Sequence, residues 1–188
     1  MINLLKGLNI YLVGMMGVGK TTIGQLLAEE LGYRFFDTDV LIEQVYQGTI
    51  KEIFANQGEE SFRQLETQVL GQVSAYGRSV IATGGGIVLK RTNWSYLRQG
   101  LVVWLDAKPE VIIQRLQGDT TRPLIETDNP ASRLRSILNQ RESIYAESDL
   151  RINVAETDTP EAVKEKILAA IPTVIKPELT SPQIVDAN

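Results

Sequence analysis

The sequence contains no cysteine and no histidine among its 188 residues. Without cysteine, the chain cannot form disulfides, thiolate metal sites or a thiol nucleophile. Without histidine, it cannot build a Ser-His-Asp triad or an imidazole metal site, and it lacks the usual general base at neutral pH. Any acid–base chemistry must therefore depend on carboxylates, lysine or tyrosine.

Long apolar runs and an excess of positive charge are also missing. No run reaches the length of about 18 apolar residues that a membrane-spanning helix needs. The net charge is −4 and the isoelectric point is about 5.0, which favours neither nucleic acid nor an anionic bilayer. The apolar stretch 8–18 lacks the flanks of a signal peptide. We therefore expect a cytoplasmic protein with neither a membrane nor a nucleic-acid partner.

The length and an apolar content of 43% predict one globular domain with a sizeable core. We expect this domain to cover residues 1–171. Residues 172–188 contain three prolines in a weakly patterned stretch and are predicted to be a flexible tail. Residues 117–131 are polar and interrupted by Gly118, Pro123 and Pro130, as expected for a mobile lid.

The most informative stretch is GMMGVGKT at residues 14–21, which fits the phosphate-binding pattern G-x-x-x-x-G-K-[ST]. Residues 8–13 before it read as a buried strand. Residues 21–31 after it have apolar side chains at helical spacing, and Gly32 follows as a helix stop. A phosphate-binding loop requires this order of strand, glycine-rich loop and helix.

This loop predicts a nucleoside triphosphate site. Its glycines allow backbone N–H groups to turn inward around phosphates, at the positive end of the following helix. Lys20 can reach the β- and γ-phosphates, and the Thr21 hydroxyl can bind Mg²⁺. The predicted ATP-binding residues of this stretch are Gly14, Met15, Gly17, Val18, Gly19, Lys20, Thr21 and Thr22.

Further strands and helices alternate along the chain. Strands are expected at 33–36, 79–83, 101–106 and 150–154. Helices are expected at 40–46, 50–54, from 58 onward, 93–98, 109–116, 132–146 and 160–171. This alternation predicts a three-layer α/β/α P-loop NTPase fold with a central parallel sheet, nucleoside-monophosphate-kinase-like, with a mobile lid.

Polar residues and glycines follow the predicted strands, where such sheets bind their ligands. Asp37 and Asp39 come after the second strand, and Thr83 followed by Gly84-Gly85-Gly86 comes after the third. Taken alone, the two aspartates would be read as a helix N-cap pair and the glycines as a loose turn. Their position after strands of a P-loop sheet favours a phosphate site flanked by carboxylates and bare backbone.

Several separated motifs resemble the shikimate kinase family over residues 9–171. Besides the P-loop, they are Phe36-Asp37-Thr38-Asp39 with Ile42-Glu43, Phe62-Arg63 with Glu66, Thr83-Gly84-Gly85-Gly86, Thr121-Arg122-Pro123-Leu124, and Arg141 with Tyr145. Each short motif is weak by itself, whereas the whole set in this order is highly specific. Two departures are Thr38, where many members have serine, and residues 1–7, which lie outside the shared region.

The resemblance implies ATP-dependent phosphorylation of the 3-hydroxyl of shikimate on the pathway to chorismate and aromatic amino acids, with Mg²⁺ as cofactor. It implies Lys20, Asp39 and Arg122 as catalytic residues, and Thr21 and Asp37 (through water) as the metal site. Arg115, Arg122, Thr159 and Pro160 would complete the ATP site. Asp39, Arg63, Gly84, Gly85, Gly86 and Arg141 would bind the substrate, with Glu66 orienting Arg63.

Two alternatives stay open at the level of the sequence. One is another small-molecule P-loop kinase, for gluconate or a nucleoside monophosphate. The other is a non-catalytic nucleotide-binding regulator, which would be expected to have lost Lys20, Asp39 or a substrate-site arginine. In isolation, Arg63, Glu66 and Arg141 would be read as solvated charges on helix surfaces. We expect a monomer, because no large apolar surface stripe is left over.

Overall fold

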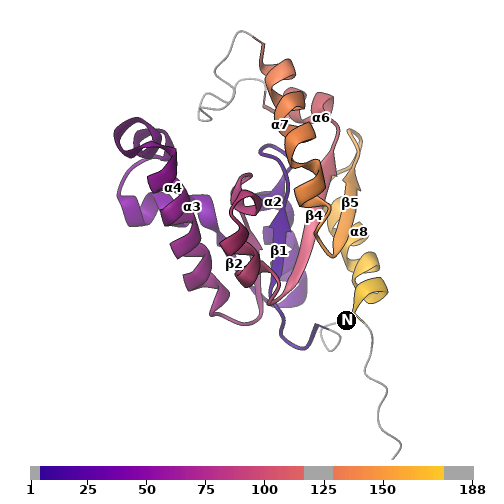
Figure 1. Cartoon of the computed structure of the whole chain (residues 1–188). Helices are drawn as coiled ribbons and strands as arrows, with labels where there is room; N and C mark the ends of the chain where they lie inside the picture. The colour runs from indigo at the N-terminus through magenta and orange to yellow at the C-terminus, as the bar shows by residue number, and fades with distance from the viewer. Residues whose placement is uncertain (1–4, 117–128, 176–188) are drawn as a thin grey trace, which may run out of the picture.

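The computed structural model describes residues 5–116 and 129–175 of the chain. At the centre of this part is a five-stranded, wholly parallel sheet with the order β2-β3-β1-β4-β5 (Figure 1). The strands are β1 (Ile10–Val13), β2 (Arg34–Asp37), β3 (Ser79–Ala82), β4 (Leu101–Ala107) and β5 (Leu150–Val154). All the strands expected from the sequence are confirmed, with small differences at their ends.

Helices cover both faces of the sheet, as predicted. They are α2 (Lys20–Leu31), α3 (Thr38–Tyr46), α4 (Ile50–Ser74), α5 (Trp94–Leu97), α6 (Pro109–Arg115), α7 (Pro130–Tyr145) and α8 (Pro160–Val174), with 3₁₀ turns at Ile87–Leu89 and Arg91–Asn93. On one face, α2 and α8 pack against each other and against the strands. On the other face lie α7, α5 and the C-terminal part of α4 (Figure 1). The three-layer α/β/α architecture is therefore confirmed.

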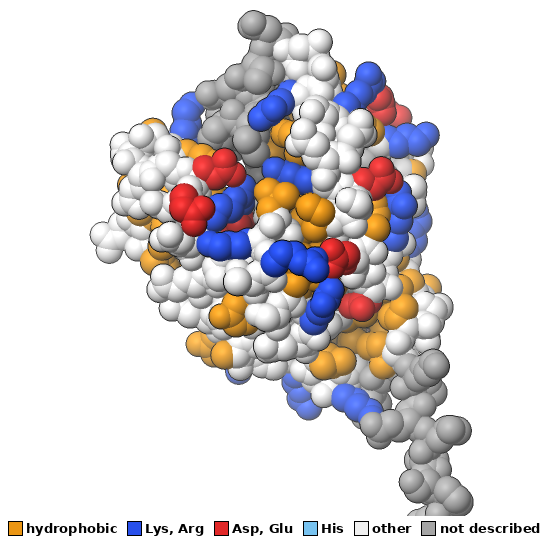
Figure 2. All heavy atoms as spheres, in the orientation of Figure 1, with side chains coloured by type: hydrophobic (Ala, Val, Ile, Leu, Met, Phe, Trp, Pro, Cys, Tyr) orange, Lys and Arg blue, Asp and Glu red, His pale blue; other side chains and the backbone are white. Residues whose placement is uncertain are grey.

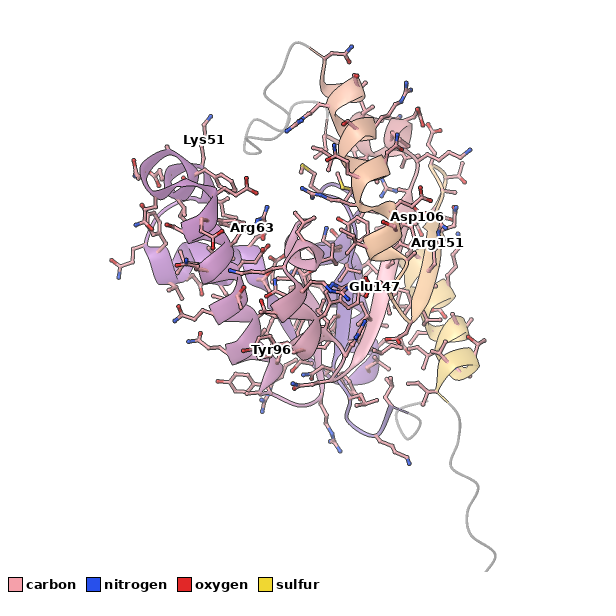
Figure 3. The ribbon with its side chains drawn as sticks, viewed as in Figure 1. Lys51, Arg63, Tyr96, Asp106, Glu147 and Arg151 are labelled. Atoms are coloured by element: carbon pink, nitrogen blue, oxygen red, sulfur yellow. The ribbon has the colours of Figure 1, made fainter. Side chains whose placement is uncertain are left out.

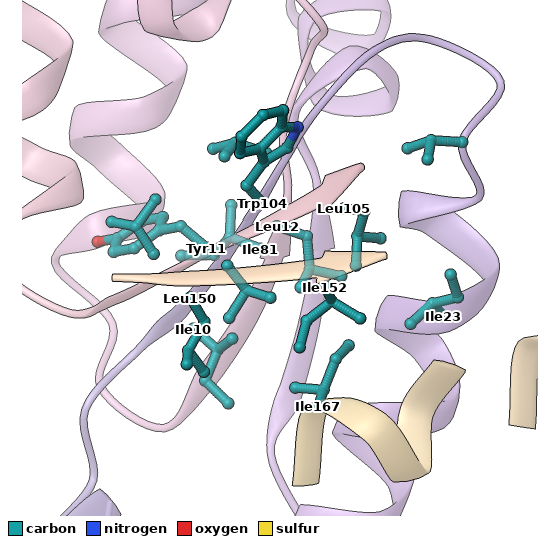
Figure 4. Close-up of a cluster of buried hydrophobic side chains, with 14 of the residues drawn as sticks. Ile10, Tyr11, Leu12, Ile23, Ile81, Trp104, Leu105, Leu150, Ile152 and Ile167 are labelled. Carbon is teal, nitrogen blue, oxygen red and sulfur yellow. The ribbon is translucent and has the colours of Figure 1, made fainter. Parts of the chain in front are cut away.

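The main core lies between the sheet and these helices. All four residues of β1 are buried, because helices cover both faces of that strand. Figure 4 shows strand side chains such as Leu12 and Ile152 close to Ile23 of α2 and Ile167 of α8. Burying one such side chain stabilises the fold by about 1.5–3 kcal/mol. This two-sided burial explains why the central strands β1, β3 and β4 read as nearly unbroken apolar runs, whereas the edge strands β2 and β5 are partly exposed.

A second, smaller cluster joins α3 to α4. Its buried members are Ile42, Ile53, Phe62 and Val69. Within α4 the backbone leaves helical geometry at Gly58, with φ 81° and ψ 174°. The sequence predicts separate helices before and after this glycine; in the structure the two helical stretches follow one another directly and meet at Gly58. The Phe62-Arg63 motif lies just after this break.

Helix ends and the N-terminus differ from the predictions. Helix α7 begins at Pro130 rather than 132, with the Asn129 side chain as its N-cap, so residues 130 and 131 of the expected lid belong to this helix. Helix α8 continues past residue 171 to Val174 and contains Pro172. Leu5 is completely buried in the main core, so this part of the expected extension is a structural element.

Parts of two predictions lie outside the described residues: the lid from 117 to 128 and the tail from 176 to 188. Among the helices that are described, none is both long enough and apolar enough to cross a bilayer. Figure 2 shows basic and acidic side chains interspersed over one face of the molecule, without a single large basic patch on that face.

Candidate active site

The P-loop connects β1 to α2 at the carboxyl edge of the sheet. Gly14 has a positive φ of 136°, and a Cβ added there would lie 2.4 Å from the carbonyl oxygen of Leu105. A side chain cannot be accommodated at this position, so the loop can pass close to β4 only because residue 14 is glycine. In the described structure no side chain caps α2 at Gly19, which leaves the first N–H groups of that helix to other acceptors.

Lys20 lies over this loop. Its side chain is buried, and its ammonium Nζ donates hydrogen bonds of 2.8 Å to the carbonyl oxygens of both Gly14 and Met15. The charge is therefore held at the centre of the loop, within the ring of backbone that the sequence predicts to surround phosphates.

Thr21 and Asp37 meet beside the loop. The Thr21 hydroxyl donates a 2.6 Å hydrogen bond to Oδ2 of Asp37. The other oxygen of Asp37, Oδ1, accepts from the backbone N–H groups of Asp39 at 3.0 Å and Val40 at 3.4 Å. Asp37 is thus the N-cap of α3, as the local interpretation predicts, while its second oxygen faces the P-loop threonine.

This pair fits Mg²⁺ by its chemistry. A hydroxyl and a carboxylate are hard oxygen donors, which Mg²⁺ prefers, and Mg²⁺ in kinases takes few protein ligands and keeps several waters. Within residues 5–116 and 129–175, no group of three or more acidic residues is arranged as a metal cage. The donor set is therefore suited to an ion held jointly by the protein, water and phosphates.

The triple-glycine segment follows β3 and lies against three different neighbours. The Gly84 N–H donates to the hydroxyl of Thr38 at 3.0 Å. A Cβ added at Gly84 would lie 2.7 Å from Oε1 of Glu66 and 2.8 Å from Oδ1 of Asp39, and one at Gly86 would lie 2.3 Å from Nη1 of Arg63. The interpretation as a loose turn is therefore wrong. Thr38 supplies this hydroxyl, and a serine at the same position could supply it as well.

Arg63 and Glu66 form a buried ion pair on α4. Nη1 of Arg63 donates to Oε2 of Glu66 at 2.8 Å, and Nη2 lies 3.2 Å from Oε1 of the exposed Glu59. Burial raises the pKa of Glu66, and the adjacent Arg63 charge only partly opposes this rise. For Arg63 burial lowers the pKa, but Glu66 and Glu59 outweigh burial and raise it, so the guanidinium stays charged. Figure 3 shows Arg63 on α4.

Helix α7 closes the other side of the glycine segment. Nη1 of Arg141 donates to the Gly85 carbonyl oxygen at 3.0 Å, and the Tyr145 hydroxyl donates to the same oxygen at 2.5 Å. Arg141 is buried, so the expectation of solvated helix-surface charge is wrong for it, as it is for Arg63 and Glu66. The sequence analysis did not predict a role for Tyr145, although its spacing of four residues from Arg141 places both on one side of the helix.

One pocket brings most of the predicted site residues together. Those that line it are Gly17, Gly19, Lys20, Thr21, Thr22, Asp37, Asp39, Arg63, Gly84, Gly85, Gly86 and Arg141. Its wall also contains Val40, Ile50, Phe54 and Phe62, and the rings of Phe54 and Phe62 are 4.8 Å apart. Sequence reasoning missed this apolar wall, because Val40, Ile50 and Phe54 read as ordinary amphipathic helix positions. The pocket thus combines positive charge, carboxylates and an apolar surface.

The remaining predicted ATP-site residues lie elsewhere. Arg115 donates from Nη1 to the Val18 carbonyl oxygen at 3.0 Å, so it contacts the P-loop without lining the pocket. Thr159 is the N-cap of α8 and accepts a 3.2 Å hydrogen bond from the Ala162 N–H. Arg122 lies outside the described residues.

Known proteins resemble this chain over most of its length. The family model described as shikimate kinase matches residues 16–172. A shikimate kinase from Microcystis aeruginosa is 56% identical over 174 residues, covering 93% of this chain and 92% of that protein. A solved structure of shikimate kinase from Acinetobacter baumannii in complex with shikimate has a TM-score of 0.86 and 38% sequence identity, covering 91% of this chain and 96% of that one.

The gluconate-kinase alternative receives much weaker support. A solved structure of a gluconokinase from Sinorhizobium meliloti has a TM-score of 0.54 and 18% sequence identity, a level at which the fold alone is shared. The long matches and the geometry of the pocket agree with each other, and the chain belongs to the shikimate kinase family.

Proposed function

We propose that this pocket binds ATP and shikimate and transfers the γ-phosphoryl group of ATP to the 3-hydroxyl of shikimate, giving shikimate 3-phosphate and ADP. The product lies on the route to chorismate and the aromatic amino acids. The observation that supports this most directly is that two arginines and Asp39 line one pocket together with the P-loop lysine.

The P-loop half would bind the phosphates. Lys20 would exchange its carbonyl partners, Gly14 and Met15, for the β- and γ-phosphate oxygens. Thr21, and Asp37 through water, would hold Mg²⁺, which when bound neutralises charge on the phosphates. Arg115 and the turn at Thr159 and Pro160 would contact the adenine.

The α3–α4 half would bind shikimate. Arg63 and Arg141 suit a carboxylate, because each guanidinium presents several N–H donors in a planar fork. The glycines at 84–86 would present backbone N–H groups where a side chain would collide with Glu66, Asp39 or Arg63. The shikimate ring would lie against the apolar wall formed by Phe54 and Phe62.

Asp39 would accept the proton of the attacking hydroxyl or orient that hydroxyl towards the phosphate. In a chain without histidine, a carboxylate is the natural group for this task. Lys20 and Arg122 would stabilise the charge that spreads over the transferred group, Arg122 in the manner of an arginine finger. Closing the lid over both substrates would exclude water and so prevent wasteful hydrolysis of ATP.

We also propose a cytoplasmic monomer. The exposed large hydrophobic side chains of the described residues are spread over several elements: Val40 and Val45 lie on α3, Tyr76 lies after α4 and Val174 lies on α8. Such scattered side chains form no continuous interface. Size-exclusion chromatography with light scattering should give the mass of one chain, and a dimer mass would contradict the proposal.

The decisive test of the proposed reaction is ADP release from MgATP by the purified protein, with and without shikimate. Quinate and gluconate serve as controls. Shikimate alone should stimulate ADP release strongly, and the product should be shikimate 3-phosphate. ATP binding without stimulation by shikimate would leave a nucleotide site but rule out this substrate assignment.

A further inference from the structure

Tyr145 is a completely buried residue at the end of α7 whose hydroxyl lies between the two halves of the pocket. It donates a 2.5 Å hydrogen bond to the carbonyl oxygen of Gly85 and lies 3.7 Å from the sulfur of Met15 in the P-loop. Its ring is stacked on Trp104 of β4, with centroids 5.6 Å apart. The ring is therefore fixed by packing against the sheet, and the hydroxyl is held at the glycine segment.

The Gly85 carbonyl has two donors, and one of them is Arg141 at 3.0 Å. A carbonyl oxygen has two lone pairs, so it can accept from both. If Arg141 turns its N–H groups towards a substrate carboxylate, the carbonyl retains the bond from Tyr145. Without that bond, the partly buried carbonyl would depend on Arg141, and substrate would compete with Gly85 for the same guanidinium.

The orientation of this carbonyl also determines where the next N–H points. The Gly85–Gly86 peptide is planar and trans, so its C=O and the N–H of Gly86 point in opposite directions. Glycine leaves the flanking backbone dihedrals unusually free, so a side-chain bond to the carbonyl has a larger influence here than elsewhere. The N–H of Gly86 is directed away from Tyr145, and the Cα of Gly86 lies beside the Arg63 guanidinium.

We propose that Tyr145 is a positioning residue for shikimate binding: its hydroxyl fixes the Gly85–Gly86 peptide and leaves Arg141 available to the substrate carboxylate. This inference rests on the proposed function. It concerns a residue that needs no contact with either substrate.

The protonation of Tyr145 supports the assignment. Burial raises its pKa to about 12, and the nearby charge of Arg141 opposes this rise only in part. The hydroxyl therefore keeps its proton at any working pH and remains a hydrogen-bond donor. A tyrosinate could not serve in this way.

The test is the substitution Tyr145→Phe, which removes one oxygen and keeps the ring on Trp104. Losing one buried hydrogen bond should raise KM for shikimate by about five- to tenfold. KM for ATP should change by less than about twofold, because the P-loop keeps its own backbone bonds. If Tyr145 had a purely structural role, the substitution would change KM for shikimate and KM for ATP to a similar extent.

Tyr11→Phe is the matched control. Tyr11 is also completely buried, and among the described residues its hydroxyl has no hydrogen-bond partner. This variant should leave both KM values unchanged. Thermal unfolding supplies a second readout that needs no turnover: shikimate should stabilise Tyr145→Phe less than it stabilises the wild type, whereas MgATP should stabilise both equally.

The outcomes separate two kinds of failure. Suppose that shikimate stimulates the wild type and that Tyr145→Phe has an unchanged KM for shikimate. This result would overturn the positioning role of Tyr145 and leave the proposed function intact. Equal rises in both KM values would also overturn the positioning role, in favour of a general packing effect. A wild type without any response to shikimate would overturn the proposed function itself.

Discussion

The two halves of the pocket are built in different ways. The phosphate half is a single continuous stretch, residues 14–21, in which Lys20 is held by carbonyls five and six residues away. The substrate half is assembled from α3, α4, the glycine segment and α7. Its connecting bonds span 46 residues between Thr38 and Gly84 and 60 between Gly85 and Tyr145. The proposed phosphate site is therefore a local feature of the sequence, whereas the proposed shikimate site depends on tertiary packing.

The largest expected effect is a fall in kcat on substitution of Asp39, which lies where the two halves of the pocket meet. Asp39→Asn should lower kcat by about 10²–10⁴-fold, because the amide cannot accept the proton of the attacking hydroxyl. Initial rates at saturating shikimate and MgATP measure this effect. Asp106→Asn, in which the altered residue pairs with Arg151 away from the pocket, should keep the wild-type rate. A small effect of Asp39→Asn would assign Asp39 an orienting role only.

The substrate half should be sensitive to loss of one partner of its buried ion pair. Arg63→Ala leaves the Glu66 carboxylate buried without its charged partner, which should cost about 3–5 kcal/mol of unfolding free energy and greatly raise KM for shikimate. Arg151→Ala should cost at most about 1 kcal/mol, because the Arg151 side chain that pairs with Asp106 is half exposed. Urea unfolding of both variants checks this contrast.

The pH dependence of Arg63→Ala follows from Glu66. Its folded-state pKa is already raised by burial, and losing the Arg63 charge should raise it further. When the pKa of Glu66 is higher in the folded state than in the unfolded state, protonated Glu66 favours the folded state. This contribution to the free energy of unfolding is fully present below the unfolded-state pKa and is lost as the pH rises through the folded-state pKa. The variant should therefore unfold more easily at pH 8 than at pH 5. Adding Glu66→Gln should largely remove this pH dependence, and failure to do so would assign it to another group.

A steric change should affect the two substrates differently. In Gly86→Ala the new Cβ would lie 2.3 Å from Nη1 of Arg63 and push that guanidinium away. We expect a rise of about tenfold in KM for shikimate, from an overpacking cost of about 1–3 kcal/mol, with little change for ATP. Gly77→Ala is the control, because its Cβ would make only an ordinary 3.6 Å contact. Equal effects of Gly86→Ala on both substrates would remove the distinction between the halves.

The smallest expected effect is that of Thr38→Ser. The serine retains the hydroxyl that accepts from the Gly84 N–H and loses one buried methyl group. The free energy of unfolding should fall by about 1 kcal/mol, and KM for shikimate should change by less than about twofold. Thr38→Ala should have the larger effect on KM, because it leaves that N–H without its acceptor. Thermal unfolding and steady-state kinetics measure both variants.

Local signals predicted most of the fold. The strands were predicted from short stretches rich in apolar residues, and Gly32 marked a helix end that the structure confirms. The predicted end of the last helix, α8, at residue 171, was wrong. It was placed there because a proline, here Pro172, usually follows a helix end. In the structure Pro172 lies inside its last turn, where the missing N–H removes only one helical hydrogen bond.

The substrate half was accessible from the sequence only through the family resemblance. Nothing local distinguishes the buried Arg63 and Arg141 from solvated helix charges, because their burial depends on a glycine segment tens of residues away. The bond from Tyr145 to Gly85 was missed for the same reason, whereas the apolar wall at Phe54 was missed because its residues read as ordinary amphipathic helix positions. Leu5 was missed because the contacts that bury it come from the main core rather than from its own segment.

The break in α4 at Gly58 has a consequence for how cooperatively the protein unfolds. Its φ of 81° and ψ of 174° lie in a region that only glycine occupies readily, yet no atom lies within 4 Å of an added Cβ. The small cluster of Ile42, Ile53, Phe62 and Val69 joins α3 to α4 across this break. It is separate from the main core between the sheet and its helices. Amide hydrogens of α3 and of residues 50–57 should therefore exchange with solvent through openings that leave the sheet intact, and shikimate should slow that exchange.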